Sequence, residues 1–267
     1  MEIINTPPAE KRVIKAVLFD FDGTISTLRH GWENIMEPMM LEMLSDGQKP
    51  DSKLIKKVKE YIDKSTGIQT IHQMSWLADE VRKRGLTHKF FDDPWWYKSE
   101  YNRRLMIPVE ERMDLIKSGK KNSEDFLIKN SVDMLEFLKS RSIKMFVASG
   151  TDDADVKREA EILGVDSYFS AIAGAPAGKI SCSKEAVLRE LVESQGYTKG
   201  ELAVIGDGKV EIMLGREVGA LTLGLASDEV KRAGINETKK KRLIRAGAHA
   251  IAGDFTDINS IAKLFGL

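Results

Sequence analysis

The chain has 267 residues, of which 42% are hydrophobic and 31% are charged. This balance is typical of a globular protein and excludes an intrinsically disordered chain. The 41 lysines and arginines are matched by 41 aspartates and glutamates, so the net charge gives no reason to expect binding to nucleic acid or to a membrane surface. The length allows one α/β core with a second unit inserted into it, or one large domain.

Two further features bear on the compartment. No stretch approaches the ~20 apolar residues that a membrane-spanning helix needs, and residues 1–15 lack the pattern of a signal peptide. The one cysteine, Cys182, excludes an internal disulfide and fits a reducing environment. We therefore expect a cytoplasmic protein, either a monomer or a homodimer, in which Cys182 is a loop thiol without a nucleophilic role.

Short apolar runs, rich in valine, isoleucine, leucine and alanine, predict strands that are buried on both faces of a parallel sheet. Between the later runs, apolar residues recur at helical spacing over 132–138, 156–163 and 187–192. Strands that alternate with helices predict an α/β fold with a mostly parallel sheet and helices on both faces. The expected strands are residues 16–19, 145–148, 202–205, 221–225 and 248–252.

The alternation pauses between residues 25 and 130. This interval carries all four tryptophans and long helical patterns over 54–62 and 71–84, with no convincing strand. We predict a helical domain, residues 27–121, that is inserted into a core made of residues 1–26 and 122–267. Near the other end of the chain, the basic run at 239–242 is interpreted as the solvated face of a helix.

The first expected strand ends in two aspartates, Asp20 and Asp22, followed at once by Gly23. In open α/β sheets, ligands bind at the carboxyl ends of the strands, and alternation along an extended chain points both carboxylates the same way. Two like charges so close need a cation or a shared proton. Mg²⁺ is the natural cation, because it prefers oxygen ligands and is held by few carboxylates together with substrate phosphate.

A second acidic turn follows the third expected strand. Asp207 lies between two glycines, and Glu211 comes four residues later. If the turn leads into a helix, this spacing places Glu211 near the loop that carries Asp207.

The string Asp-Phe-Asp-Gly-Thr after a hydrophobic strand resembles the first motif of the haloacid dehalogenase superfamily. The other motifs of that family have counterparts here in the same order, over about 15–24 and from about 130 to the C-terminus. The resemblance implies a Rossmann-like core, a helical cap between the first and second motifs, and a phosphatase that uses Mg²⁺. In it, Asp20 attacks phosphorus and Asp22 acts as acid and then base.

The resemblance also assigns the remaining residues of the site. Ser149, which follows the second expected strand, hydrogen-bonds a phosphoryl oxygen. The phosphate-binding lysine is Lys184, favoured over its rival Lys179 by its separation from Asp207. The metal ligands are Asp20, the main-chain carbonyl of Asp22, Asp207 and Glu211; for Glu211, contact with the metal through water and orientation of the lysine both stay open.

The implied substrate is a small phosphorylated metabolite, such as a sugar phosphate or a phosphoglycolate-like ester. An occluding cap favours small substrates, and an acid at position 22 favours ester hydrolysis over dehalogenation. The alternatives are a phosphomutase of the β-phosphoglucomutase type and a regulator that binds phosphate without turnover. Candidate substrate contacts are Thr24, Gly150, Arg29 and His30, with Arg103 and Arg104 near the return from the insertion.

Overall fold

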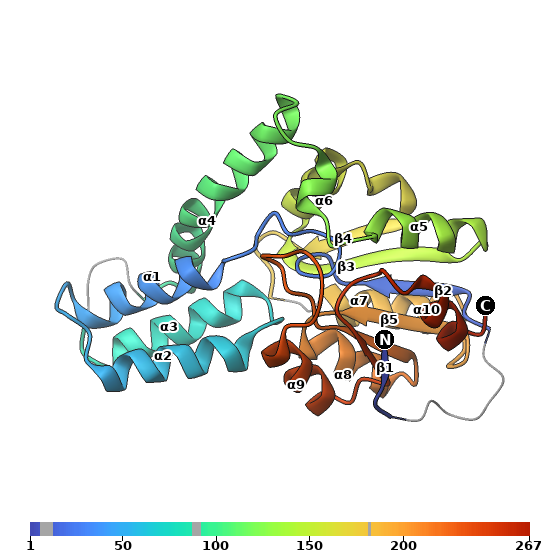
Figure 1. Ribbon diagram of the computed structural model, residues 1–267. Helices are drawn as coiled ribbons and strands as arrows, with labels where there is room; N and C mark the ends of the chain where they lie inside the picture. Colours follow the sequence, from blue (N-terminus) through green and yellow to red (C-terminus); the bar gives the residue numbers. More distant parts are fainter. Residues whose placement is uncertain (6–12, 87–91, 181–182) are drawn as a thin grey trace. The chain divides into compact units, whose positions relative to one another are not determined.

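The computed structural model describes residues 1–5, 13–86, 92–180 and 183–267 (Figure 1). The predicted loop thiol Cys182 lies outside these ranges. The chain forms two compact units, the first from residues 1–30 and 112–267 and the second from residues 31–111. The second unit starts four residues after and ends ten residues before the limits of the insertion expected from the sequence, 27–121.

The first unit is built on a seven-stranded sheet in the order β1-β7-β6-β5-β2-β3-β4. All pairings are parallel except the one between β1 and β7 at the edge. The mostly parallel sheet expected from the sequence is therefore confirmed. The strands are β1 (Glu2–Ile3), β2 (Ala16–Phe19), β3 (Lys144–Asp152), β4 (Ala171–Ala175), β5 (Leu202–Gly206), β6 (Leu221–Leu225) and β7 (Ala250–Ala252).

Helices cover both faces of this sheet, as predicted. In Figure 1, α5 and α6 lie on one side of it, and α7, α8 and α9 lie on the other. Short helical turns connect several elements. The helices are α5 (Ser131–Ser140), α6 (Asp153–Leu163), α7 (Ser183–Arg189), α8 (Lys209–Glu217), α9 (Glu237–Arg245) and α10 (Ile258–Phe265), and the turns are η1 (Ser123–Phe126), η2 (Asp166–Tyr168) and η3 (Glu190–Ser194).

Strand β2 shows why its residues form an unbroken apolar run. Leu18 packs on one face with Leu188 and other residues of the α7 side. Phe19 points to the opposite face, where its ring meets Phe169 and Phe255 edge to face at centroid distances of 6.0 and 6.5 Å. Successive side chains of the strand are thus both buried, which is the environment of a central parallel strand.

The described residues of the second unit form helices joined by turns, and none of them lies in a strand. The unit contains α1 (Glu33–Ser45), α2 (Ser52–Ser65), α3 (Thr70–Lys83) and most of α4 (Pro94–Lys117). Helix α2 starts where the Asp51 carboxylate accepts the N–H of Leu54 at 2.7 Å, which satisfies one of the free donors of the first turn. The helical character predicted for the insertion is confirmed.

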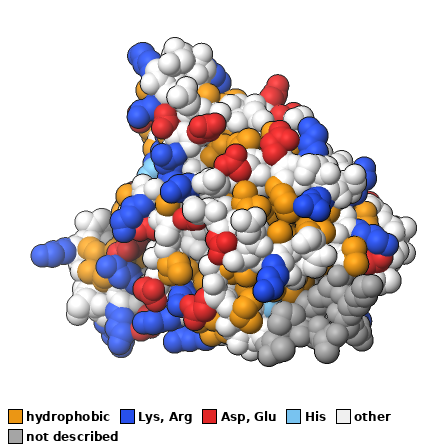
Figure 2. Space-filling view, turned by 45° about the vertical axis from the view of Figure 1, so that its right-hand side comes forward, with side chains coloured by type: hydrophobic (Ala, Val, Ile, Leu, Met, Phe, Trp, Pro, Cys, Tyr) orange, Lys and Arg blue, Asp and Glu red, His pale blue; other side chains and the backbone are white. Residues whose placement is uncertain are grey.

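The interpretation of residues 239–242 as a solvated face is wrong at its first residue. Lys239 is buried, with 8% of its surface exposed, and lies on the inner side of α9 together with Leu243. Elsewhere acidic and basic side chains are intermixed on the face shown in Figure 2. Within the described ranges, no helix combines the length and the apolar composition that crossing a membrane would require.

Candidate active site

Three parallel strands reach the same edge of the sheet together. Phe19, the last residue of β2, is paired with Val147 of β3 and with Ile205 of β5. Because these strands are parallel and end at the same level, Asp20 and Asp207 lie side by side at the carboxyl end of the sheet. This is the edge where open α/β sheets bind their ligands.

Asp20 is fixed by the loop that it begins. Its backbone N–H continues the ladder to Ile205, at 2.9 Å from the carbonyl oxygen, and its Oδ1 accepts the N–H of Phe21 at 2.9 Å. The chain then folds back, so that the N–H groups of Ile25 and Ser26 both bond to the Phe21 carbonyl. Burial raises the pKa of Asp20 well above its ordinary value, while the Lys184 ammonium opposes this shift.

Lys184 joins the two acidic turns. The side chain is almost fully buried, and its Nζ lies 3.0 Å from Asp20 Oδ2 and 2.8 Å from Glu211 Oε2. Burial lowers the pKa of Lys184, but the two carboxylates raise it above its usual range, so the group is a charged ammonium. Its rival Lys179 is exposed. Of the two lysines, the structure brings Lys184 to the nucleophile expected from the sequence.

Glu211 folds back onto the turn that carries Asp207. Its Oε1 accepts the N–H of Gly208, and its Oε2 binds Lys184. A Cβ at Gly206 would lie 2.3 Å from Glu211 Cγ, so only glycine leaves room for this carboxylate. Of the two roles left open by the sequence, these contacts favour orientation of Lys184.

The carboxylate of Asp22 faces β3. Its Oδ2 accepts a hydrogen bond from Thr151 Oγ1 at 2.8 Å and a longer one from Ser149 Oγ at 3.4 Å. Its Oδ1 is buried and makes no hydrogen bond to the described part of the chain. Thr151 was not among the predicted site residues, although it lies two positions after Ser149 on the same strand, where alternation points both side chains the same way. Gly150 lies between them.

Arg29 is held by acids of α6. Its guanidinium contacts Glu159 through Nε at 3.0 Å and Nη2 at 2.6 Å, and Nη2 lies 3.4 Å from Asp155. Arg29 is 8% exposed and Glu159 is fully buried. The positive charge of Arg29 also interacts electrostatically with the carboxylate of Asp22. This bidentate pair favours a structural role for Arg29, and its contact with substrate stays a prediction.

The other candidate substrate contacts have varied surroundings. Thr24 is buried, and its Oγ1 has no hydrogen-bond partner within the described ranges. His30 is half-buried, with Nδ1 3.0 Å from the Thr27 carbonyl. In the second unit, Arg103 and Arg104 both bind Glu100. The role of each in substrate binding stays a prediction.

The acidic cluster fits a divalent cation. Asp20, Asp207 and Glu211 each offer an oxygen, and these oxygens lie within 4.8 Å of one another. The ammonium of Lys184 is shared by Asp20 and Glu211, and that of Lys239 by Asp207 and Glu229. Four carboxylates therefore face two ammonium groups, so negative charge exceeds positive charge at this point. A hard cation that prefers carboxylate oxygens would offset it, which suits Mg²⁺.

A second lysine enters this cluster without having been predicted. Lys239 Nζ lies 2.6 Å from Asp207 Oδ2 and 2.6 Å from Glu229 Oε1. Its spacing of four residues from Leu243 is the signal that could have placed it on the buried side of a helix. Nothing in the sequence around Glu229 indicates the contact.

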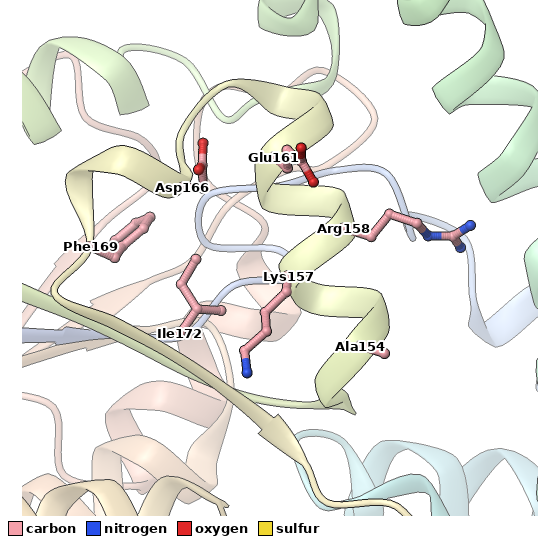
Figure 3. A pocket seen from close by; sticks show the side chains of 7 residues that line it. All are labelled: Ala154, Lys157, Arg158, Glu161, Asp166, Phe169 and Ile172. Carbon is pink, nitrogen blue, oxygen red and sulfur yellow. The ribbon is translucent and has the colours of Figure 1, made fainter.

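The hollow in Figure 3 is separate from these carboxylates. It measures about 510 Å³ and lies between α6 and the segment that follows it. Its lining includes Lys157, which is paired with Asp153 at 2.7 Å, and Arg158, which is paired with Asp155 at 3.6 Å. None of the residues expected to act in catalysis lines it.

Comparison with solved structures shows the same fold. A predicted phosphoglycolate phosphatase from Haemophilus somnus 129PT has 18% sequence identity and a TM-score of 0.61, over 93% of this chain and 98% of that one. For a β-phosphoglucomutase from Clostridium difficile the identity is 16% and the TM-score 0.62, over 95% and 97%. A predicted phosphatase from Clostridium acetobutylicum has 17% identity and a TM-score of 0.61, over 94% and 99%.

No curated protein matches the sequence. A sequence model of the haloacid dehalogenase-like hydrolases matches residues 14–219, which include both acidic turns and Lys184. The match extends over most of the chain and agrees with the resemblance carried by the motifs. The chain belongs to the haloacid dehalogenase-like hydrolases.

Proposed function

We propose that the chain is a Mg²⁺-dependent phosphatase that hydrolyses a small phosphate monoester through an aspartyl phosphate on Asp20. The observation that carries this proposal is the convergence on Asp20. Its Oδ2 binds the buried ammonium of Lys184, and its carboxylate lies with those of Asp207 and Glu211 at one edge of the sheet. A carboxylate nucleophile flanked by a fixed cation suits attack on an anionic phosphoryl group.

In the first half of the proposed reaction, an Asp20 oxygen forms a bond to phosphorus as the bond from phosphorus to the ester oxygen breaks. Asp22 gives its proton to the departing oxygen, which leaves as an alcohol. Thr151 Oγ1 donates a hydrogen bond to Asp22 Oδ2 and so holds this carboxyl group in position. Lys184 and the hydroxyl of Ser149 stabilise charge on the phosphoryl oxygens.

In the second half, Asp22 takes a proton from water as the water oxygen attacks phosphorus. The bond between phosphorus and Asp20 breaks, which releases inorganic phosphate and restores the carboxylate. Asp20, Asp207 and the carbonyl of Asp22 are the groups that would hold Mg²⁺, and Glu211 would either reach it through water or orient Lys184. When bound, this ion supplies charge neutralisation for the phosphoryl oxygens and the nucleophile.

The phosphatase is tested by measuring inorganic phosphate released from hexose and pentose phosphates, polyol phosphates and phosphoglycolate. The wild type should release phosphate with Mg²⁺ and not with EDTA, and Asp20→Asn should release none. The matched control is Asp166→Asn, an exposed aspartate of the same unit that should behave as wild type. Absence of release from every ester by folded, metal-bound protein would reject the proposal.

A phosphomutase would use the same pair of aspartates. It returns the phosphoryl group to a sugar and depends on a bisphosphate activator, so it releases little free phosphate. Isomerised sugar phosphate in place of inorganic phosphate, with a requirement for the bisphosphate, would support the mutase. The intact set of Asp20, Asp22 and Asp207 argues against a regulator without turnover.

A further inference from the structure

The ammonium of Lys239 is enclosed by three acceptors. Its Nζ lies 2.6 Å from Asp207 Oδ2, 2.6 Å from Glu229 Oε1 and 3.3 Å from Ser227 Oγ. An ammonium has three N–H donors, so each has a partner. Two of the three acceptors are carboxylates. The fold therefore places a lysine ammonium directly on Asp207 and balances it with Glu229.

The segment that supplies Glu229 is tied to the loop of the nucleophile. Ser227 Oγ donates to the carbonyl of Gly23, inside the turn that follows Asp20. The base of the segment is closed where Ser227 bridges Ile235. Glu229 is therefore held beside the acidic cluster by the fold, and its carboxylate is a built part of the surroundings of Lys239.

In this arrangement, the ammonium of Lys239 and a divalent metal ion would compete for the carboxylate of Asp207. Lys239 occupies Oδ2 of Asp207, and Asp207 is one of the three carboxylates whose oxygens could hold a divalent ion. A single positive charge on one oxygen of a carboxylate repels a double positive charge on the same group, and poor solvation strengthens that repulsion. Glu229 lies outside the three carboxylates and offsets part of the charge of Lys239.

We propose that Lys239 weakens the binding of the divalent cation at Asp207 and that Glu229 counteracts it, so that this pair sets the metal affinity of the site. The inference rests on the proposed metal-dependent phosphatase. Lys239 is then a positioning residue that acts through Asp207. It keeps one oxygen of that carboxylate engaged and limits the cation to the other.

A purely structural role predicts the opposite change in affinity. Loss of an orienting contact to a metal ligand lowers metal affinity, by about 10- to 100-fold in known sites. Loss of a positive charge at the ligand raises it, and repulsion of a doubly charged ion is twice that of a single charge at the same distance. For a buried ammonium bonded directly to the ligand, we expect the loss of repulsion to be the larger effect.

The test measures Mn²⁺ binding to the full chain by calorimetry without substrate. Lys239→Met should lower the dissociation constant by at least about tenfold. Lys239→Arg retains the charge and should stay near wild type. Glu229→Gln removes the counter-charge and should raise the dissociation constant. The matched control is Lys240→Met on the same helix, whose ammonium pairs with Glu2 on the surface and should have no effect.

Unchanged or weaker Mn²⁺ binding by folded Lys239→Met would overturn the inference. If Lys239→Met does not fold, Glu229→Gln provides the test. Unchanged or tighter Mn²⁺ binding by Glu229→Gln would also overturn the inference. Wild-type protein that binds Mn²⁺ and releases phosphate, with no effect of either variant, leaves the proposed function intact. Wild-type protein that binds no Mn²⁺ removes the proposed metal-dependent function and the inference with it.

Discussion

Gly23 allows the two acidic turns to meet. Its φ is +73°, and a Cβ at this position would lie 2.4 Å from Asp207 Oδ2 and 3.1 Å from Lys239 Nζ. A larger residue would therefore meet two obstacles: the left-handed backbone costs about 1–2 kcal/mol for a residue with a Cβ, and the Cβ would displace Asp207. Glycine is therefore required at position 23 both for its backbone conformation and because a side chain would clash with Asp207.

We predict that Gly23→Ala abolishes most of the phosphatase activity by displacing Asp207. The control is Gly164→Ala, because Gly164 has nearly the same φ of +71° but has no atom within 4 Å of an added Cβ. Gly164→Ala should lose about 1–2 kcal/mol of unfolding free energy, measured in urea, and Gly23→Ala should lose more, because its Cβ also meets Asp207. Only Gly23→Ala should lose phosphate release and Mn²⁺ affinity, and equal activity of the two variants would contradict this account.

Arg29 neutralises a carboxylate that is fully buried. We predict that Arg29→Met destabilises the protein by about 3–5 kcal/mol, because it leaves Glu159 as an uncompensated buried charge. The control is Arg158, a half-buried arginine on α6 beside Glu159, and Arg158→Met should change stability less, because Asp155, with which it pairs, is only partly buried. If Arg29 instead served mainly to bind substrate, Arg29→Met would raise KM and leave the unfolding free energy unchanged.

The stability lost in Arg29→Met should depend on pH. Burial raises the pKa of Glu159 to about 7 even beside Arg29, and loss of the guanidinium raises it further. A carboxyl whose pKa is higher in the folded than in the unfolded chain stabilises the fold at low pH and loses that contribution as pH rises through the folded value. The deficit relative to wild type should therefore shrink from about pH 8 to about pH 5.

At the scale of single residues, the sequence indicated those that lie at strand ends. Asp20 and Asp207 each follow an apolar strand and precede a glycine, so their place could be inferred from local pattern. Lys239 and Glu229 could not be placed in the same way. Their contacts join a helix, a loop and a strand end that are distant along the chain, and a charge run by itself resembles a solvated surface.

The first turn of α7 brings one of the two candidate lysines to the acidic cluster. Lys184 is the second residue of the helix and points to Asp20 and Glu211, whereas Lys179 is exposed five residues earlier. We predict that Lys184→Met lowers phosphate release by at least about 100-fold, as loss of a preorganised charge donor does elsewhere. Lys179→Met should have wild-type activity. A larger loss in Lys179→Met than in Lys184→Met would reverse the assignment.

Among the elements, central strands were easier to predict than edge strands. Strands β2 and β5 are buried on both faces and read as continuous apolar runs. Strand β4 has the sequence Ala-Ile-Ala-Gly-Ala, with one large apolar side chain, and β1 has two residues. Neither carries the enrichment in branched and aromatic residues by which strands are recognised.

The helices of the second unit show a similar limit. Proline lies inside α1 at Pro38 and inside α4 at Pro108. Because proline usually ends or kinks a helix, the sequence suggested a helical insertion without fixing these two helices. Their extent depends on packing that no local pattern reveals.

At the scale of the whole molecule, the chain leaves the first unit after residue 30 and re-enters it at residue 112. Arg112 donates to the carbonyls of Leu28 and His30, so the outgoing and returning segments are tied at the base of the insertion. A contact between segments more than 80 residues apart produces no recognisable sequence pattern in either segment. The sequence therefore predicts that an insertion exists and places its limits only to within several residues.

A divalent cation held by the acidic cluster would stabilise the first unit. Without a metal ion, the carboxylates of Asp20, Asp207 and Glu211 outnumber the two ammonium groups that pair with them. A ligand that binds only the folded state, present at 100 times its dissociation constant, stabilises it by about 2.7 kcal/mol. We therefore predict that Mg²⁺ at that excess raises the melting temperature by about 5 °C relative to EDTA.

The same shift identifies the residues that bind the ion. It should disappear in Asp207→Asn, which removes one negative charge from the cluster, and persist in Asp166→Asn, an exposed aspartate of the same unit. Scanning calorimetry with and without Mg²⁺ measures the shift, and the same scans with NaCl at matched ionic strength separate specific binding from screening. An equal rise in both variants would place the ion elsewhere on the molecule and remove the cluster from the proposed mechanism.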